Sequence, residues 1–246
     1  STTFNSFQKV APLAPAVVVS GKRMTVADIA VPQQASVDKA MGFSAVLKWQ
    51  PSDNVELRSI TAWRTVDAEQ WDNSGGAHRN PFLPNAPFSR YSLSFLDQDQ
   101  FSQELQIVGR IGRLDYVAGL YYYNESAGEI AATPSTNKWN ATGTAYTILD
   151  ALTWQPANLS IARATRADSK SYAAFGQLTY GITDAIRITA GGRFTRDEKS
   201  GNLYKVNNVA TNFPFVFKGD RVDPLIIAAW DAAQGVNLYA KYATGY

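Results

Sequence analysis

The feature that most constrains this chain is an alternation of apolar and polar residues with a period of two, which recurs in stretches of about ten residues. Successive side chains of a β-strand point to opposite faces, so each stretch predicts a strand with one apolar and one polar face. The clearest stretch sets one apolar series against one polar series: Ile186, Ile188, Ala190 and Phe194 against Arg187, Thr189, Arg193 and Thr195. We expect these two series to lie on opposite faces of one sheet.

Pairs of such stretches are joined by short segments rich in Gly, Asp, Asn and Pro, which predicts four β-hairpins. We expect the hairpins at about residues 41–65, 100–124, 171–197 and 222–245, with turns at 50–54, 109–113, 181–184 and 231–235. The segments between hairpins, about 66–99, 125–170 and 198–220, are much longer and hold six of the 11 prolines. Residues 1–40 have the same irregular character and are interpreted as loop. The pattern predicts short turns at one end of the sheet and long loops at the other.

Composition excludes several classes of function. The chain has no cysteine and one histidine, His78, so it offers no thiolate chemistry and no multi-histidine metal site. The net charge of +2 gives no indication of a nucleic-acid partner. The longest apolar run, Val10 to Val19, is interrupted by Pro12 and Pro15, which excludes a transmembrane helix there. No catalytic residues, cofactor or metal site are predicted.

Short turns at one end, long loops at the other and alternating strands are typical of an outer-membrane β-barrel. Aromatic residues at the strand ends fit the two interfacial girdles of such a barrel: Trp49, Tyr180 and Trp230 near the short turns, and Trp63, Tyr122, Tyr123 and Phe194 towards the long loops. A soluble β-sandwich shows the same alternation, because its apolar faces form a buried core. We therefore predict an all-β antiparallel transmembrane barrel segment of about eight strands, with a carbohydrate-binding sandwich as an alternative.

Several segments resemble the barrel hairpins of TonB-dependent outer-membrane receptors. They are FSQELQIVG at 101–109, LDYVAGLYYYNE at 114–125, SITAWR at 59–64, SYAAFGQLTY at 171–180, IRITAGGRFTRDEK at 186–199 and VNLYAKYATGY at 236–246. The resemblance implies that residues 1–246 are part of a barrel domain of about 22 strands with a plugged lumen. It also implies a location in the outer membrane of a Gram-negative bacterium, in contact with its lipid.

Receptors of this family import ferric chelates, siderophores or other small nutrients with energy from an inner-membrane TonB complex, so the resemblance implies a plug domain and that complex as partners. We recognise no plug domain and no TonB box in this sequence. A complete eight-stranded barrel with a structural or adhesive role stays an alternative. Because the chain stops within a strand at Tyr246, we expect an open sheet, in which strand 41–50 does not pair with strand 236–245.

Candidate ligand contacts are aromatic, basic and histidine side chains of the long loops, which suit an anionic or aromatic ligand. They are Trp71, His78, Arg79, Arg90, Trp139 and Trp154. A second set is expected to face the lumen, from the polar sides of the strands: Arg58, Glu104, Arg187, Arg193 and Lys241. These residues are positioned to meet a ligand, a plug or one another.

Overall fold

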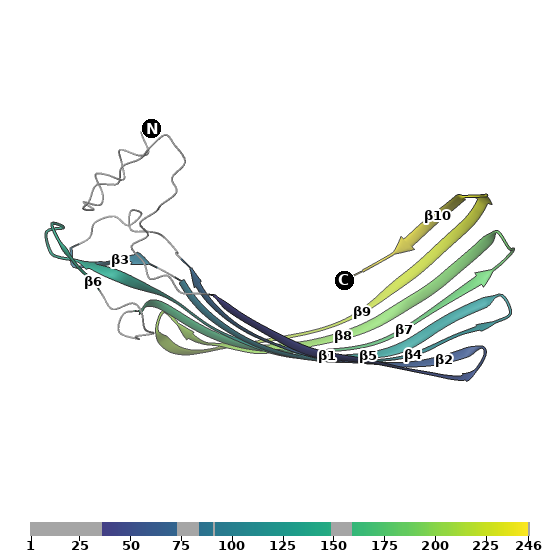
Figure 1. Cartoon of the computed structure of the whole chain (residues 1–246), viewed down its shortest axis with the longest axis horizontal. Coiled ribbons are helices and arrows are strands. Elements are labelled where there is room, and N and C mark those ends of the chain that lie inside the picture. The colour runs from purple at the N-terminus through teal and green to yellow at the C-terminus, as the bar shows by residue number, and fades with distance from the viewer. Residues whose placement is uncertain (1–35, 73–83, 91, 149–158, 246) are drawn as a thin grey trace.

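The computed structural model describes residues 36–72, 84–90, 92–148 and 159–245, and it forms one antiparallel sheet. Its strands are β1 (Val37–Ser52), β2 (Val55–Asp72), β3 (Pro87–Arg90), β4 (Ser92–Ile111), β5 (Leu114–Trp139), β6 (Tyr146–Ile148), β7 (Leu159–Gly181), β8 (Ile186–Val206), β9 (Val209–Ala233) and β10 (Val236–Ala243). Eight strands follow one another side by side in the order β1-β2-β4-β5-β7-β8-β9-β10, while the short β3 and β6 pair with the far end of β5. The sheet is long, curved and open (Figure 1).

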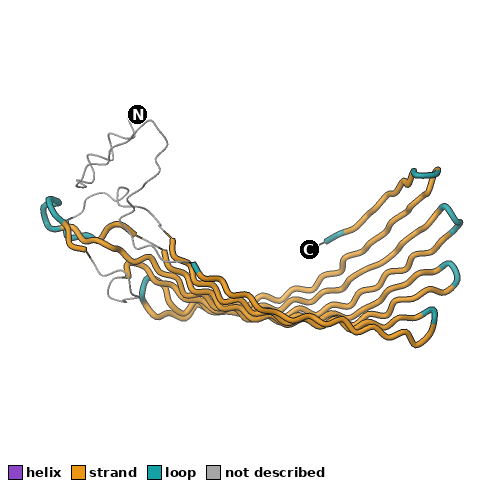
Figure 2. Tube along the Cα trace, in the orientation of Figure 1, coloured by secondary structure: helices purple, strands orange, loops and turns teal. Residues whose placement is uncertain are grey.

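The four predicted short turns all lie at the same end of this sheet, as Figure 2 shows, which confirms that part of the prediction. The predicted hairpins are present, but their strands are longer than expected, 16 to 26 residues for all except β10. Segments assigned to long loops therefore belong largely to strands. Residues 66–72, 92–99, 125–139 and 159–170 all extend the wall beyond the predicted strand ends.

The predicted loop at 198–220 is wrong. β8 and β9 continue through this segment and meet in a tight turn at Asn207 and Asn208, with Val206 paired to Val209. Pro214 sits inside β9, where its carbonyl side and its neighbours still pair with β8, and a strand position with one unpaired edge tolerates proline. The rim opposite the four short turns therefore also carries a short turn, so the predicted separation of short turns and long loops is incomplete.

The register gives the sheet one polar and one apolar face. In β8, Ile186, Ile188 and Phe194 are exposed on one side, whereas Arg187, Arg193 and the buried Thr189 lie on the other, which confirms the predicted facing. From Ile186 to Asp197, side chains of the polar side are half-buried or buried and those of the apolar side are exposed. Side chains crowd together on the inside of a curved sheet, so the polar face is the inner one.

A single sheet leaves little room for a core. Among the described residues the buried apolar side chains are small apart from Leu93 and Trp139, and many large apolar side chains stay exposed on the outer face, such as Leu47, Leu105 and Leu120. An apolar face of this size has to be covered by something other than water. Among the described residues, no helix is long and apolar enough to cross a membrane.

The strand order also bears on the two alternative folds, a β-sandwich and a closed eight-stranded barrel. The described strands form one sheet with no second layer facing it, which excludes a β-sandwich for this part of the chain. β1 and β10 stand at the two ends of the strand order and do not pair, so these strands do not close into an eight-stranded ring. The open sheet predicted from the sequence is confirmed.

Candidate functional site

The five residues predicted to face the lumen share the polar face. Arg58 pairs with Gln106, and the same row of partners continues across the sheet to Arg193. Glu104 lies two residues from Gln106 on β4, and Arg187 and Lys241 have the same orientation on β8 and β10. Residues that pair directly across neighbouring strands point to the same side of a sheet. The register alone therefore places all five residues on the polar face.

Arg193 is the centre of a cluster on this wall. Its guanidinium lies 5.3 Å from the ring centroid of Tyr121 and 5.8 Å from that of Phe175, both within the range of a cation–π contact. Its Nε donates a hydrogen bond of 3.1 Å to Thr195. On the neighbouring strand β9, the direct partner of Arg193 is Asp223. The aromatic rings and the carboxylate therefore hold a cation in place on the inner surface of the wall.

Asp223 also joins two other groups at this position. Arg221 donates from Nε to its Oδ1 at 2.7 Å, and the Thr244 hydroxyl donates to the same oxygen at 2.9 Å. The side chain of Asp223 is only 12% exposed, so its charge is well shielded from water. Two arginines and one carboxylate leave this patch with a net positive charge, which favours an anionic ligand or partner.

A second cluster surrounds Glu125, further from the short turns. Gln98 and Gln100 donate to its Oε2 at 2.8 and 2.7 Å, and the Tyr123 hydroxyl donates to the same oxygen. This cluster was not predicted from the sequence, because residues 66–99 and 125–170 were assigned to loops. The alternation of Gln98 and Gln100 with Asp97 and Asp99 is the signal that places the two amides on one face.

An aromatic series on β9 was missed for the same reason. Phe213, Phe215 and Phe217 occupy alternate positions, and their partners on β8 lie on the polar face. The ring of Phe215 lies against Gly201, whose missing side chain leaves room for it. The extended wall therefore carries aromatic rings as well as charges, and their spacing of two is visible in the sequence.

The residues predicted as loop contacts are not gathered by the structure into one site. Trp71 and Arg90 are in strands β2 and β3 rather than in loops, and Trp139 ends β5 with 2% of its surface exposed. The loop assignment is therefore wrong for these three. His78, Arg79 and Trp154 lie outside the described residues.

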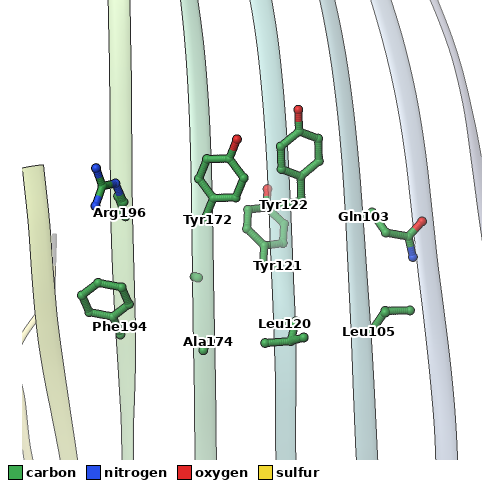
Figure 3. A pocket seen from close by; sticks show the side chains of 10 residues that line it. Gln103, Leu105, Leu120, Tyr121, Tyr122, Tyr172, Ala174, Phe194 and Arg196 are labelled. Atoms are coloured by element: carbon green, nitrogen blue, oxygen red, sulfur yellow. The ribbon is translucent and has the colours of Figure 1, made fainter. Parts of the chain in front are cut away.

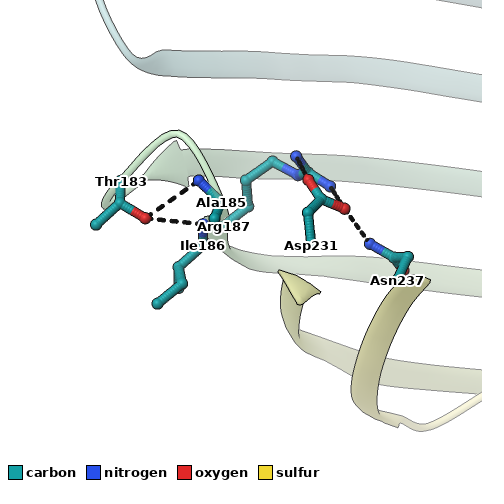
Figure 4. A network of polar contacts seen from close by, with 6 residues as sticks. All are labelled: Thr183, Ala185, Ile186, Arg187, Asp231 and Asn237. Atoms are coloured by element: carbon teal, nitrogen blue, oxygen red, sulfur yellow. Dashed lines mark hydrogen bonds and ion pairs between the residues drawn. The ribbon is translucent and has the colours of Figure 1, made fainter. Parts of the chain in front are cut away.

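The rim with the short turns is fastened by polar contacts (Figure 4). The Arg187 guanidinium donates to the two carboxylate oxygens of Asp231 at 2.7 and 3.4 Å, and Asn237 donates to Asp231 at 2.6 Å. The Thr183 hydroxyl accepts hydrogen bonds from the next turn residues. Arg187 is thus tied into the rim, so its contacts are structural. No group of three potential metal-ligating side chains occurs among the described residues.

A curved antiparallel sheet with a polar inner face, an apolar outer face and turns at its rims defines the wall of a transmembrane β-barrel. The model of the TonB dependent receptor-like β-barrel family matches residues 42–246. The chain therefore belongs to this family. Proteins of this family are outer-membrane receptors of Gram-negative bacteria and not enzymes.

Solved structures agree with this fold. The ferric yersiniabactin uptake receptor FyuA from Yersinia pestis is 18% identical with a TM-score of 0.60, and the siderophore receptor PiuA from Acinetobacter baumannii is 14% identical with a TM-score of 0.63. They match 84% and 85% of this chain, which spans only 27% and 32% of theirs. The ferric citrate transporter FecA is 16% identical with a TM-score of 0.52, and the match covers 84% of this chain and 26% of FecA. A search of curated proteins gives no match.

Proposed function

We propose that this chain forms part of the barrel wall of a receptor that imports a ferric chelate, a siderophore or another small nutrient across the outer membrane of a Gram-negative bacterium. In this proposal a plug domain fills the lumen and an inner-membrane TonB complex supplies the energy. The family match and the three solved receptors support the proposal. The observation that carries it is the inner face of the wall, where Arg193 is held between two aromatic rings and beside Asp223.

The chemistry of this inner face suits an anionic ligand with aromatic parts. Guanidinium groups bind carboxylates and other oxyanions through paired hydrogen bonds, and aromatic rings stack against planar groups. The Phe213, Phe215 and Phe217 series adds apolar contacts nearer the rim with the longer connections. Trp71, His78, Arg79, Arg90, Trp139 and Trp154 remain our predicted ligand contacts.

Uptake in the native host tests this proposal. A deletion strain is grown with ferric chelates of different chemistry as the only iron source, and uptake of each radiolabelled chelate is measured with and without a proton uncoupler. We expect the deletion strain to lose energy-dependent uptake of one class of chelate. Reintroduction of the wild-type gene should restore that uptake. The Arg193→Ala variant should reach the outer-membrane fraction at the wild-type level but show reduced uptake. Arg166→Ala changes an arginine on the outer face, and its uptake should equal that of the wild type. Unchanged uptake of every chelate and nutrient tested would contradict a transport function.

A further inference from the structure

Three phenylalanines bring a large apolar surface to the polar face of the wall. Phe213, Phe215 and Phe217 alternate along β9, and their exposed fractions are 61%, 46% and 46%. Lipid covers the outer face of a membrane barrel, but it does not enter the lumen. These rings therefore have no lipid to contact, and an exposed apolar patch of this kind marks a binding site.

The rings of Phe215 and Phe217 lie along the wall instead of projecting from it. A Cβ at Gly201 would collide with the ring tip of Phe215, and one at Gly219 would lie 2.9 Å from Cζ of Phe217. Each ring tip thus rests on a glycine, which is on β8 for Phe215 and two residues along β9 for Phe217. The two rings form an aromatic platform, and their exposed side is a surface on which a ring of a ligand can stack.

The charges around this platform disfavour an anion. In the rows that contain inner-face residues 213–219 of β9, strands β5, β7 and β8 carry one basic side chain, Lys199, and three acidic ones, Glu125, Glu129 and Asp197. Arg163 lies just beyond these rows and pairs with Glu129 at 3.5 Å, so the balance stays negative. The surroundings therefore favour a neutral ligand, in contrast to the positive cluster nearer the short turns.

The same rows offer both donors and acceptors of hydrogen bonds. Lys199 is the direct partner of Phe217, and Ser169 and Glu125 follow in the same row on β7 and β5. The Oε2 atom of Glu125 accepts three hydrogen bonds, while Oε1 accepts none from the residues that the structure describes. An ammonium, a hydroxyl and a carboxylate oxygen beside an aromatic surface suit the hydroxyl groups of sugars, which donate as well as accept.

The platform lies where the outer face stops being apolar, on the side away from the four short turns. Tyr122 and Tyr172 pair on the outer face (Figure 3). The outer-face positions that follow on β7 are Lys170 and Asp168, and these two residues flank Ser169 of the Phe217 row. The platform is therefore near a mouth of the lumen, where a ligand arrives from water.

We propose that this platform binds a neutral oligosaccharide, with sugar rings stacked on Phe215 and Phe217. The C–H groups on one side of a sugar ring carry a small positive charge and pack against the negative face of an aromatic ring. Glu125 lies three strands from Phe217, a span of about 14 Å, so a chain of sugars reaches both and a single ring does not. A planar anionic chelate would also stack, but the acidic side chains repel it.

The platform is separate from the cluster at Arg193. Gly219 and Arg221 occupy the inner-face positions of β9 between Phe217 and Asp223, the partner of Arg193. The inference adds a second ligand, a neutral glycan, to the proposed function. It rests on that function only because the inner face has to border an open lumen.

Binding to the purified full-length receptor in mild detergent tests the inference. The probes are maltohexaose, cellohexaose and xylohexaose, measured by isothermal titration calorimetry after folding has been checked by heat-modifiable gel mobility. We expect at least one probe to bind the wild type with the same Kd at about 0.1 M and about 1 M salt, because salt does not screen a neutral ligand. Phe215→Ala and Phe217→Ala should each weaken binding about tenfold. Phe215→Tyr keeps the ring and should bind like the wild type.

Phe194→Ala is the matched control. Phe194 is 45% exposed but lies on the outer face in the row of Leu120 and Ala174 (Figure 3), so its loss should leave binding unchanged. Binding of none of the three probes, or an equal loss in Phe194→Ala, would overturn the inference. Uptake of a chelate by the same cells would then still support the proposed function. Binding that depends on Phe215, without uptake of any nutrient, would support the inference and contradict transport.

Discussion

Adjacent residues of one strand face different surroundings, and an arginine scan on β7 makes this measurable. Leu178 is 51% exposed on the apolar face, two residues from Tyr180 near the short turns, while the neighbouring Gln177 lies on the polar face. Leu178→Arg should lower the free energy of unfolding by about 1–2 kcal/mol, because an arginine on the lipid face is desolvated, and this cost falls from the bilayer midplane towards the interface. Gln177→Arg should change it much less. Urea unfolding in lipid vesicles checks both, and equal effects would argue against lipid on this face.

Thr189 shows why Gln177 is the better control of the two polar-face positions. Thr189 is only 9% exposed, and its hydroxyl shares a hydrogen bond of 2.8 Å with that of Thr179. An arginine there would crowd the inner face as well as break this contact. Position on the polar face is thus predictable from alternation, but the room available at each position is not.

Two glycines of the wall should respond in opposite ways to a methyl group. A Cβ at Gly119 would lie 2.4 Å from the Phe175 ring and 2.8 Å from the Leu105 carbonyl oxygen, whereas at Gly176 the nearest atom is 3.8 Å away. Gly119→Ala should therefore cost about 1–3 kcal/mol through overpacking. Gly176→Ala should gain about 0.4–1 kcal/mol by restricting the unfolded chain. The urea midpoints of the two variants test this, and destabilisation by Gly176→Ala would show the packing to be misjudged.

Among the elements, the β8–β9 hairpin depends on two residues with left-handed backbone conformation. Asn207 and Asn208 have φ of 48° and 69°, the pattern of a type I′ turn, whose twist matches that of the paired strands. Asn207→Val should cost about 1–2 kcal/mol, because a β-branched residue is strained there. Asn54→Val, in a turn without positive φ at that residue, is the control and should have a smaller effect; equal losses would contradict the assigned turn.

Strand positions could be predicted from the sequence better than strand ends. Alternation at Ile186–Thr195 fixed both the strand and its two faces, because that signal depends only on neighbouring residues. Prolines and glycines such as Pro214 and Gly201 were interpreted as loop signals. The structure accommodates both inside strands, since Pro214 has one unpaired edge and Gly201 receives the Phe215 ring. Both explanations depend on contacts between strands, which the composition of a short segment does not reveal.

For the candidate site too, the face on which a residue lies could be predicted from the sequence, whereas the extent of the strands could not. The polar-face residues Arg58, Glu104 and Arg193 were assigned from alternation alone, and the register places them together. The Glu125 cluster and the β9 phenylalanines were missed because the strands around them were cut too short. Contacts across strands, such as Arg193 with Tyr121, require a register that no single stretch of sequence specifies.

At the scale of the whole molecule, the wall is one layer thick and is stabilised by its strand ladder and its surroundings rather than by a core. The long strands from β1 to β8 each pair with the next in the strand order along most of their length, and the outer face leaves Leu47, Leu105 and Leu120 exposed. Lipid on that face supplies the apolar environment that a second layer supplies in a soluble protein. Among the described strands, β1 and β10 stand at the two edges of the sheet.

Disulfide trapping distinguishes this open wall from a closed ring of eight strands. The chain has no cysteine, so introduced pairs report without background. Ala45 and Thr61 are direct partners on β1 and β2, whereas Ala45 and Ala240 lie on β1 and β10, at the two ends of the sheet. Ala45→Cys with Thr61→Cys should oxidise readily in the membrane-embedded native protein, since paired positions bring the two Cβ atoms within disulfide range. Ala45→Cys with Ala240→Cys should stay reduced, as read from thiol labelling and gel mobility. An efficient bridge in the second pair would show that β1 and β10 are neighbours and that the strands close on themselves.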